Sequence, residues 1–320
     1  MHADLLSRRV PGASLTAVYD ASSERAQETA ARLGVPAAAG AAELLGSSEV
    51  DAIAICTNTD THVDAIVAAA ATGKAIFCEK PVSLDLAEVD RALAAVSRAG
   101  VLFQVGFNRR FDPAHQSVRE AVASGSIGDV QIVRISSRDP APPPLEYART
   151  SGGLFLDMTI HDFDMARYVT GSEVVEVFAR GAVRITPELE ELGDIDTAVV
   201  TLVHESGALT VIDNSRQAVY GYDQRVEAFG SLGMAASENP LSHTGLVRTV
   251  DGTRAATLPY FFLERYVPSY LAQWDAFVTA VNHRLPAAVG GADGRAPLVI
   301  GLAARRSLDE GRPVPVSEIG

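Results

Sequence analysis

Apolar and amphipathic segments alternate along the first hundred residues. The apolar runs predict strands at Leu15–Tyr19, Asp51–Cys56, Ala75–Cys78 and Val101–Val105. The amphipathic stretches between them predict helices at Ser22–Leu33, Asp60–Thr72 and Leu84–Arg98, and a glycine follows each within two residues. Strands that alternate with helices of this length indicate βαβ units and a parallel sheet.

The pattern changes after about residue 125. A strand at Val130–Ser137 is followed by the loop Pro140–Pro144 and a helix near Thr159–Val169. Further β-like segments lie at Val174–Val183, Thr197–His204, Ala208–Asp213 and Arg225–Phe229. The turn sequence between the second and third of these favours antiparallel hairpins. Helices at Leu263–Val281 and Pro297–Leu308 complete the chain, so we expect a parallel α/β domain followed by an antiparallel-sheet domain.

Composition narrows the range of partners and locations. The 320 residues include 40 acidic and 27 basic side chains, a net charge of −13, which disfavours binding to nucleic acid or to an anionic membrane. No apolar run is long enough for a membrane span and Met1–Asp4 has no signal-peptide pattern, so we expect a cytoplasmic protein. Cys56 and Cys78 end predicted strands, and we expect both to be buried free thiols rather than catalytic ones.

Asp20 ends the first predicted strand, where a dinucleotide-binding fold places an acid that bonds ribose hydroxyls. The glycine-rich turn expected about 20 residues earlier is missing, and residues 2–9 already have a helical pattern. One interpretation makes Asp20 an ordinary turn residue. The other expects a first strand and phosphate loop of roughly 10–20 residues ahead of Met1.

Polar residues follow two other predicted strands directly. Glu79-Lys80-Pro81 and the cluster Thr57–His62 stand at carboxyl ends of parallel strands, where open α/β sheets bind ligands. The structural alternatives are a surface lysine for Lys80 and helix capping by Thr59 or Asp60.

The stretch Gly152–Asp164 contains an Asp157/His161 pair. Residues four apart share one face of a helix, and a carboxylate can hold a nearby histidine ready to accept a proton. The alternative is an N-cap beside a structurally bonded histidine. Two candidate ligands make a weak metal site, so we expect no metal.

Taken in order, Glu79-Lys80-Pro81, Gly106–Phe111 and Gly152-Gly153…Asp157…His161-Asp-x-Asp164 resemble the Gfo/Idh/MocA oxidoreductases. Within that family the chain resembles the inositol 2-dehydrogenases, through Ser137–Pro140, Asp157–Arg167 and Asn214–Arg225. The resemblance implies an NAD-binding Rossmann-like domain over residues 1–108, without its first strand and glycine loop. It also implies a substrate-binding and oligomerisation domain with a mostly antiparallel open sheet over residues 109–320.

The resemblance also implies a catalytic set of Lys80, Asp157 and His161. In alcohol oxidation His161 would accept the hydroxyl proton and Lys80 would stabilise the developing alkoxide. Expected cofactor contacts are Asp20, Thr57, Asn58, Thr59, His62, Glu79, Lys80 and Gln104. Expected substrate contacts are Lys80, Asn108, Arg109, Asp157, His161 and Tyr222, with Gln224 and Arg225 as further polar candidates.

We therefore expect an NAD-dependent oxidation of a cyclic polyol, with myo-inositol favoured. Asp20 favours NAD over NADP because a carboxylate repels a 2′-phosphate, although Arg25 weakens that preference. The alternatives are a dehydrogenase of another sugar or sugar derivative, or a non-catalytic sugar-binding member. A homo-oligomer, dimer or tetramer, is expected from the family.

Overall fold

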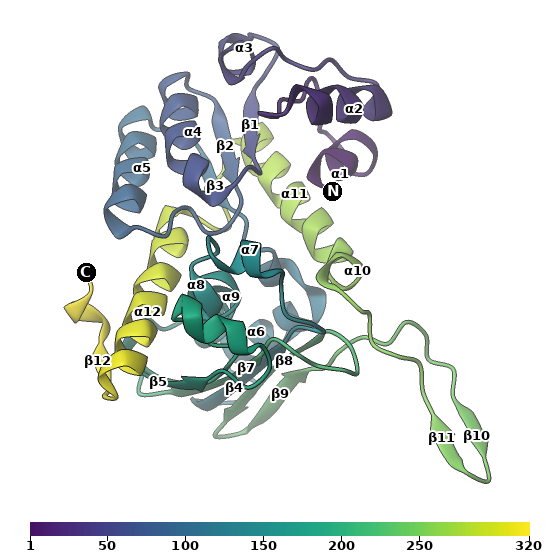
Figure 1. Cartoon of the computed structure of the whole chain (residues 1–320), viewed down its shortest axis with the longest axis vertical. Coiled ribbons are helices and arrows are strands. Elements are labelled where there is room, and N and C mark those ends of the chain that lie inside the picture. The colour runs from purple at the N-terminus through teal and green to yellow at the C-terminus, as the bar shows by residue number, and fades with distance from the viewer. The chain divides into compact units, whose positions relative to one another are not determined.

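All 320 residues are described by the computed structural model (Figure 1), and they form two compact units. The first unit comprises Met1–Asn108 and Tyr270–Ala296, and the second comprises Arg109–Ser269 and Pro297–Gly320. A segment remote in sequence therefore completes the first unit.

The first unit contains a three-stranded parallel sheet in the order β1-β2-β3. Its strands are β1 (Ala52–Ile55), β2 (Ala75–Cys78) and β3 (Phe103–Val105). Its helices are α1 (His2–Arg8), α2 (Ser23–Leu33), α3 (Ala41–Gly46), α4 (Thr59–Ala71) and α5 (Leu86–Ala99), joined by most of α11 (Val267–His283). The predicted parallel α/β architecture is confirmed.

The segment predicted as a strand at Leu15–Tyr19 forms only one bridge, between Val18 and Ala37. β1 is consequently an edge strand that pairs with β2 alone. The prediction of two buried free thiols is confirmed for Cys78, on the central strand. Cys56, just beyond the end of β1, is exposed as a residue, although burial of its thiol raises the pKa of that group.

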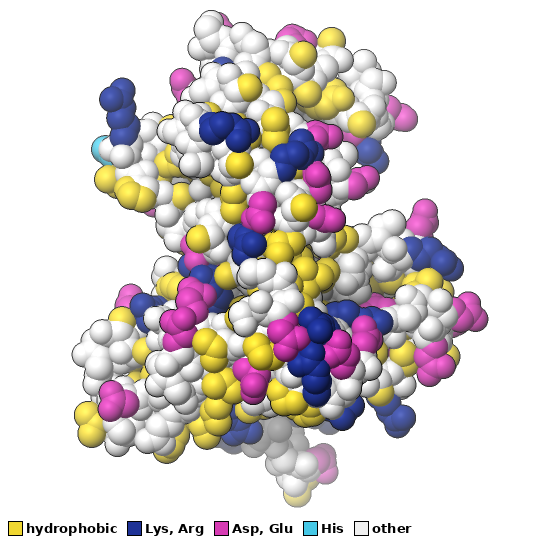
Figure 2. Space-filling model, turned by 90° about the vertical axis from the view of Figure 1, so that its left-hand side faces the viewer, with side chains coloured by type: hydrophobic (Ala, Val, Ile, Leu, Met, Phe, Trp, Pro, Cys, Tyr) yellow, Lys and Arg dark blue, Asp and Glu magenta, His cyan; other side chains and the backbone are white.

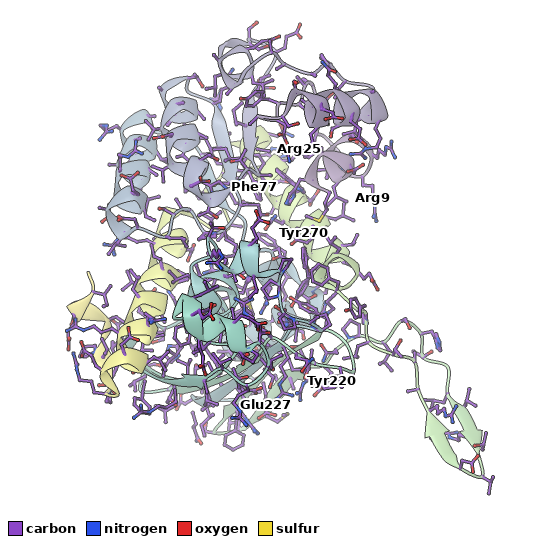
Figure 3. The ribbon with its side chains drawn as sticks, viewed as in Figure 1. Arg9, Arg25, Phe77, Tyr220, Glu227 and Tyr270 are labelled. Atoms are coloured by element: carbon purple, nitrogen blue, oxygen red, sulfur yellow. The ribbon has the colours of Figure 1, made fainter.

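An aromatic cluster attaches α11 to the rest of the first unit. The rings of Phe77 and Trp274 lie 4.2 Å apart, and Phe277 meets Trp274 edge-on at 5.7 Å. His2 joins this cluster because Trp274 Nε1 donates to His2 Nδ1 at 3.0 Å. Figure 3 labels Phe77 and Tyr270, which both flank the His2 ring. Burial of these large rings stabilises the packing of residues 270–296 in this unit.

The second unit contains a seven-stranded sheet in the order β12-β5-β6-β7-β4-β8-β9. Only the β4–β7 pair is parallel, so the predicted mostly antiparallel sheet is confirmed. The strands are β4 (Val130–Arg138), β5 (Val174–Ala182), β6 (Thr197–His204), β7 (Leu209–Ser215), β8 (Asp223–Gly230), β9 (Gly233–Ser237) and β12 (Val314–Pro315). A separate hairpin pairs β10 (Val247–Thr249) with β11 (Gly252–Arg254).

The helical elements of this unit are α6 (Pro113–Ala123), α7 (Leu145–Ala148), α8 (Gly153–Asp157), α9 (Ile160–Thr170), α10 (Phe262–Arg265) and most of α12 (Gly291–Glu310), with 3-10 turns η1 (Asn108–Phe111), η2 (Pro187–Leu192) and η3 (Val316–Glu318). The helix predicted at Leu263–Val281 is interrupted at Tyr266, and α6 was not predicted although Asp112 caps it and Pro113 opens it. No helix of the structure is both long and apolar enough to cross a bilayer.

Helices cover one face of the seven-stranded sheet (Figure 1). Buried strand residues such as Val133, Val200 and Ile212 pack with side chains of α9 and α12 in a single core. The alternate strand positions face away from that core and include several exposed apolar side chains: Val199, Leu209, Val211, Phe229 and Met234. We call these five residues the outer sheet patch. Elsewhere the surface is mixed, and Figure 2 shows acidic and basic side chains interspersed on one face of the molecule.

A buried polar network connects α9 to the sheet. Arg109 Nη1 donates to Asp162 Oδ1 at 2.7 Å and to Ser137 Oγ on β4 at 3.0 Å. The second carboxylate oxygen of Asp162 accepts from Asn214 Nδ2 on β7 at 2.8 Å. Both charged partners are almost fully buried, so the ion pair sits where an unpaired charge would be costly.

Replacing Asp162 by Asn should destabilise the protein by about 3–5 kcal/mol, because the Arg109 charge would remain buried without its counter-ion. Asp309→Asn is the control, since the Arg305–Asp309 pair is about half exposed and should contribute about 0–1 kcal/mol. Thermal unfolding of the two variants measures the difference. Equal midpoints for both variants would contradict the assignment of Arg109–Asp162 as a stabilising buried pair.

Candidate active site

The loops after β1 and β2 are held together by His62. Its Nδ1 lies 2.9 Å from the Pro81 carbonyl oxygen and its Nε2 lies 3.1 Å from the Thr57 carbonyl oxygen. The ring is buried, with 1% of the residue exposed. Both ring nitrogens face protein carbonyls, so His62 fixes the loops that carry Asn58 and Lys80. The predicted contact of His62 with a cofactor stays a prediction.

The polar cluster after β1 is not used to cap α4. Asn58 is the N-cap residue, without a side-chain capping bond, whereas Thr59 and Asp60 lie inside the helix. Capping by Thr59 or Asp60, the structural alternative, is therefore wrong. Thr57 and Thr61 share a hydroxyl–hydroxyl hydrogen bond of 2.7 Å, and the Asn58 side chain is exposed at the carboxyl end of β1.

Glu79 supports the backbone of Lys80. Its Oε2 accepts from the Lys80 N–H at 3.2 Å, and its Oε1 lies 3.0 Å from His2 Nε2. His2 Nδ1 accepts from Trp274 Nε1, and Glu79 Oε1 has no hydrogen-bond partner despite its proximity to the His2 ring. A Cβ on Gly106 would lie 2.9 Å from the Glu79 carboxyl carbon, which explains the glycine there. Through Oε2 the Glu79 side chain braces the loop, and its predicted cofactor contact stays a prediction.

Gln104 and Asn108 are also buried. Gln104 is 0% exposed and its Nε2 donates to the Gln273 carbonyl on α11 at 3.2 Å. Its predicted cofactor contact stays a prediction. Asn108 is 2% exposed and its Nδ2 has no hydrogen-bond partner. The predicted role of Asn108 in substrate binding stays a prediction.

Asp20 keeps one carboxylate oxygen available. Its Oδ1 accepts from the Ser22 N–H at 2.8 Å and from Arg25 Nε and Nη2 at 3.2 and 2.9 Å. The Ser22 hydrogen bond, followed by that of Arg25, lowers the pKa of Asp20, so the carboxyl is ionised. No protein donor contacts Oδ2, which can therefore accept from a ribose hydroxyl. Arg25, labelled in Figure 3, is committed to Asp20.

In the second unit Asp157 and His161 do not share one continuous helix. Asp157 is the last residue of α8, and His161 is the second residue of α9. The helix breaks because Thr159 Oγ1 turns toward the Leu154 carbonyl and Asn214 Oδ1, at 3.2 and 2.7 Å. The predicted shared helical face is thus wrong, although both residues remain within one short segment.

The double glycine before α8 has a steric reason. Gly152 and Gly153 both have positive φ angles, of 84° and 76°. A Cβ on Gly153 would lie 2.6 Å from Asp194 Oδ1, the same atom that accepts from the Leu154 N–H at 2.9 Å. The Asp194 carboxylate therefore anchors the start of α8, and the glycines allow its close approach.

Two side chains from outside the helical segment hold the Asp157 carboxylate. Tyr147 Oη, from α7, donates to Oδ1 at 2.8 Å, and Arg216 Nη1 lies 3.3 Å from Oδ2. The Asp157 side chain is 13% exposed. Neither Tyr147 nor Arg216 was a candidate from sequence. Arg216 lies in the stretch that carried the family resemblance, but Tyr147 follows a Pro-rich loop and gives no sequence signal.

Asp139 is a third residue that sequence reasoning missed. It directly follows β4, and burial raises its pKa to about 6. Arg216 and Arg109 act in the opposite direction, while the Asp157 and Asp162 carboxylates raise the pKa further. Its position at a strand end, just before Pro140, is the signal that could have identified it.

The predicted substrate contacts Arg109 and Tyr222 belong largely to the buried network. Arg109 is 5% exposed and bonds Asp162 and Ser137, and its predicted substrate contact stays a prediction. Its Nη2 also donates to Tyr222 Oη at 3.4 Å. Gln224 is buried and accepts from Ser137, and Arg225 pairs with Asp223. Polar type alone could not separate these structural groups from ligand-binding ones.

The residues of the first unit fit part of a dinucleotide. Asp20 offers a free oxygen for a ribose, and Asn58 and Lys80 follow neighbouring parallel strands at their carboxyl ends. The residues described contain no Gly-x-Gly-x-x-Gly, so the fit concerns the ribose and nicotinamide ends of the cofactor.

Replacing Asp139 by Asn should make stability less dependent on pH. Its folded pKa of about 6 exceeds the unfolded value near 4, so ionisation destabilises wild type as pH rises between them. The variant should gain at most about 3 kcal/mol relative to wild type between pH 4 and pH 8. Thermal unfolding of both proteins across this range measures the gain. A difference that stays constant with pH would contradict the placement of Asp139.

Comparisons with known proteins agree with this fold. The family profile described as "Oxidoreductase family, NAD-binding Rossmann fold" matches residues 1–107. The profile described as "GFO/IDH/MocA C-terminal domain" matches residues 115–236. Together they account for most of the chain.

Individual relatives cover the chain nearly end to end. The chain is 48% identical to a myo-inositol 2-dehydrogenase of Thermotoga maritima over 100% of its own length and 96% of the relative's. It is 45% identical to an inositol 2-dehydrogenase of Rhizobium meliloti, over 85% and 82% of the two chains. A scyllo-inositol dehydrogenase of Lactobacillus casei, solved with NAD(H) and scyllo-inositol, aligns with a TM-score of 0.92 at 27% identity over 99% and 95%. The chain belongs to the Gfo/Idh/MocA family of oxidoreductases.

Proposed function

We propose that this protein oxidises an inositol at a secondary alcohol with NAD⁺ as the hydride acceptor. The observation that carries the proposal is the Asp157–His161 segment. Tyr147 and Arg216 hold the Asp157 carboxylate, and His161 follows four residues later, near the start of α9. The names of the relatives support the substrate class, because the chain is 48% identical to a myo-inositol 2-dehydrogenase.

Oxidation of a secondary alcohol removes a hydride from carbon and a proton from oxygen. Bound NAD⁺ supplies the hydride acceptor. His161 accepts the hydroxyl proton, and Lys80 stabilises the negative charge that develops on the substrate oxygen. Asp157 binds a neighbouring hydroxyl or orients the reacting groups. The products are the ketone, NADH and one proton, so atoms and electrons balance.

The cofactor preference follows from Asp20. Its free Oδ2 can accept from the 2′-hydroxyl of NAD, and its negative charge repels the 2′-phosphate of NADP. Arg25 pairs with Asp20 Oδ1 and partly neutralises its charge, which weakens this preference. Thr57, Asn58 and Thr59 remain proposed contacts of the nicotinamide end.

Turnover of a polyol panel tests this function. With NAD⁺, wild type should oxidise myo- or scyllo-inositol faster than other sugars and polyols, and with NADP⁺ it should be much slower. Lys80→Ala should lower kcat by at least about 100-fold, because it removes the charge that stabilises the alkoxide. NAD binding, followed by protein fluorescence, should persist in this variant.

Other outcomes of this panel separate the remaining possibilities. Preference for a different sugar would place the enzyme elsewhere in the family. Polyol binding without turnover by wild type would identify a non-catalytic member. Full activity of Lys80→Ala would remove Lys80 from the mechanism.

We also propose that the outer sheet patch is covered by a second copy of the chain. Val199 is 52% and Phe229 is 46% exposed, and they share this face with charged side chains such as Arg134 and Glu227. Apolar side chains gathered on one exposed face mark an interaction site. A like-with-like contact between such faces buries them with the isologous symmetry common in dimers.

Phe229→Lys should shift the oligomer toward smaller species, because it places a charge in an apolar interface. Light scattering of wild type and variant measures the change in mass. The exposed Leu285→Lys on the first unit is the control and should leave the mass unchanged. A monomeric wild type would reject the proposal.

Two free cysteines, Cys56 and Cys78, are consistent with a reducing compartment. They support the proposal of a cytoplasmic location, where the NAD pool required by the reaction is also available.

A further inference from the structure

We propose that Tyr147 and Arg216 are positioning residues that together hold the Asp157 carboxylate in its working orientation. The inference rests on the proposed function, since it assigns these residues a role in turnover through Asp157. It adds two residues that were not among the site residues expected from the sequence.

The two contacts fall on different oxygens of one carboxylate. Tyr147 Oη donates to Oδ1 at 2.8 Å, and Arg216 Nη1 lies 3.3 Å from Oδ2. A single donor would leave the carboxylate free to rotate about the Cβ–Cγ bond. Donors on both oxygens oppose that rotation, because turning the group would lengthen both contacts.

Arg216 provides the rigid side of this arrangement. It directly follows β7, and its backbone N–H donates to the Asp196 carbonyl at 2.9 Å. The Asp196 carboxylate is itself fixed by the N–H groups of residues 184–186, at 2.8–2.9 Å. The guanidinium therefore extends from a backbone position that other hydrogen bonds already determine.

The guanidinium is not arranged for maximal stability. Arg216 is buried, yet its Nε and Nη2 have no hydrogen-bond partner. Buried donors without partners cost free energy, so the placement of this side chain calls for a reason other than packing. Asp157 and Asp139 supply the nearby negative charge, which places Arg216 at the electrostatic centre of this site.

Tyr147 provides the second, more adaptable side. It lies on the four-residue helix α7, directly after the Pro140–Pro144 segment, and half of its surface is exposed. Burial of the phenol, followed by the adjacent Asp157 charge, raises the pKa of Tyr147, so its hydroxyl remains a donor at neutral pH. Because the ring is half exposed, removing the hydroxyl should not disturb a core.

Tyr147→Phe tests the proposal, with Tyr220→Phe as a matched control. Tyr220, labelled in Figure 3, is also half exposed and donates to an aspartate, Asp223, at 2.7 Å. We expect Tyr147→Phe to lower kcat for inositol about tenfold, as loss of one hydrogen bond to a charged group would, with KM within about twofold. The control should keep both constants within about twofold of wild type.

Arg216 is tested by comparing Arg216→Lys with Arg216→Met. Lysine keeps the charge and should retain more of kcat than methionine, although it lacks the planar fork of the guanidinium. Thermal midpoints of all variants are measured in parallel. A positioning role predicts that Tyr147→Phe loses kcat without a lower midpoint, and that Lys rescues part of the loss at Arg216.

The outcomes separate this inference from the proposed function. Equal kcat values for wild type and Tyr147→Phe would overturn the inference alone. So would equal losses in Tyr147→Phe and Tyr220→Phe, or a loss of kcat that simply follows a lower thermal midpoint. Wild type without turnover of any inositol would overturn the proposed function and this inference with it.

Discussion

Transfer of an arginine and an aspartate out of water costs several kcal/mol for each ion, unless the two meet and their remaining polar atoms are bonded. Arg109 and Asp162 satisfy that condition, with Ser137 and Asn214 supplying the other partners. The network therefore connects a turn, two strands and the beginning of α9. Asp162 immediately follows His161, so this desolvated pair fixes the backbone from which the proposed proton acceptor extends.

In the first unit, side chains also hold loops in place, here through hydrogen bonds to backbone carbonyl and N–H groups. His62 links two loops through their carbonyls, and Glu79 bonds the N–H of Lys80. These side chains are polar and close to the carboxyl ends of the strands, yet their hydrogen bonds are made to protein. They hold the backbone around Asn58 and Lys80, whose own side chains are only partly buried or exposed. Preorganised loops of this kind reduce the ordering needed when a ligand binds.

Much of the fold was predictable because its signals are local. Periodicity and glycine stops located α5 and β2 within two residues. The assignment of Lys80, Asp157 and His161 from the order of the motifs stays a prediction. Predictions failed where the local structure depends on contacts between residues that are far apart in the sequence. The strand expected at residues 15–19 forms a single bridge, and Arg109 bonds a carboxylate far away in sequence. The path of the Pro-rich loop before Tyr147 brings its side chain to Asp157, and the spacing of apolar residues does not predict the path of a loop.

The return of residues 270–296 to the first unit has a consequence for synthesis on the ribosome. Phe77 and His2 emerge early, but Trp274, the ring they pack against, follows only after residues 109–269. At ~5–20 residues per second that delay lasts about 10–30 s. The nascent first unit therefore exposes an apolar surface while the whole sheet of the second unit is being made. The first unit therefore cannot complete its folding as soon as its N-terminal residues are made. It becomes complete only after residues 270–296, in the last third of the chain, have been synthesised.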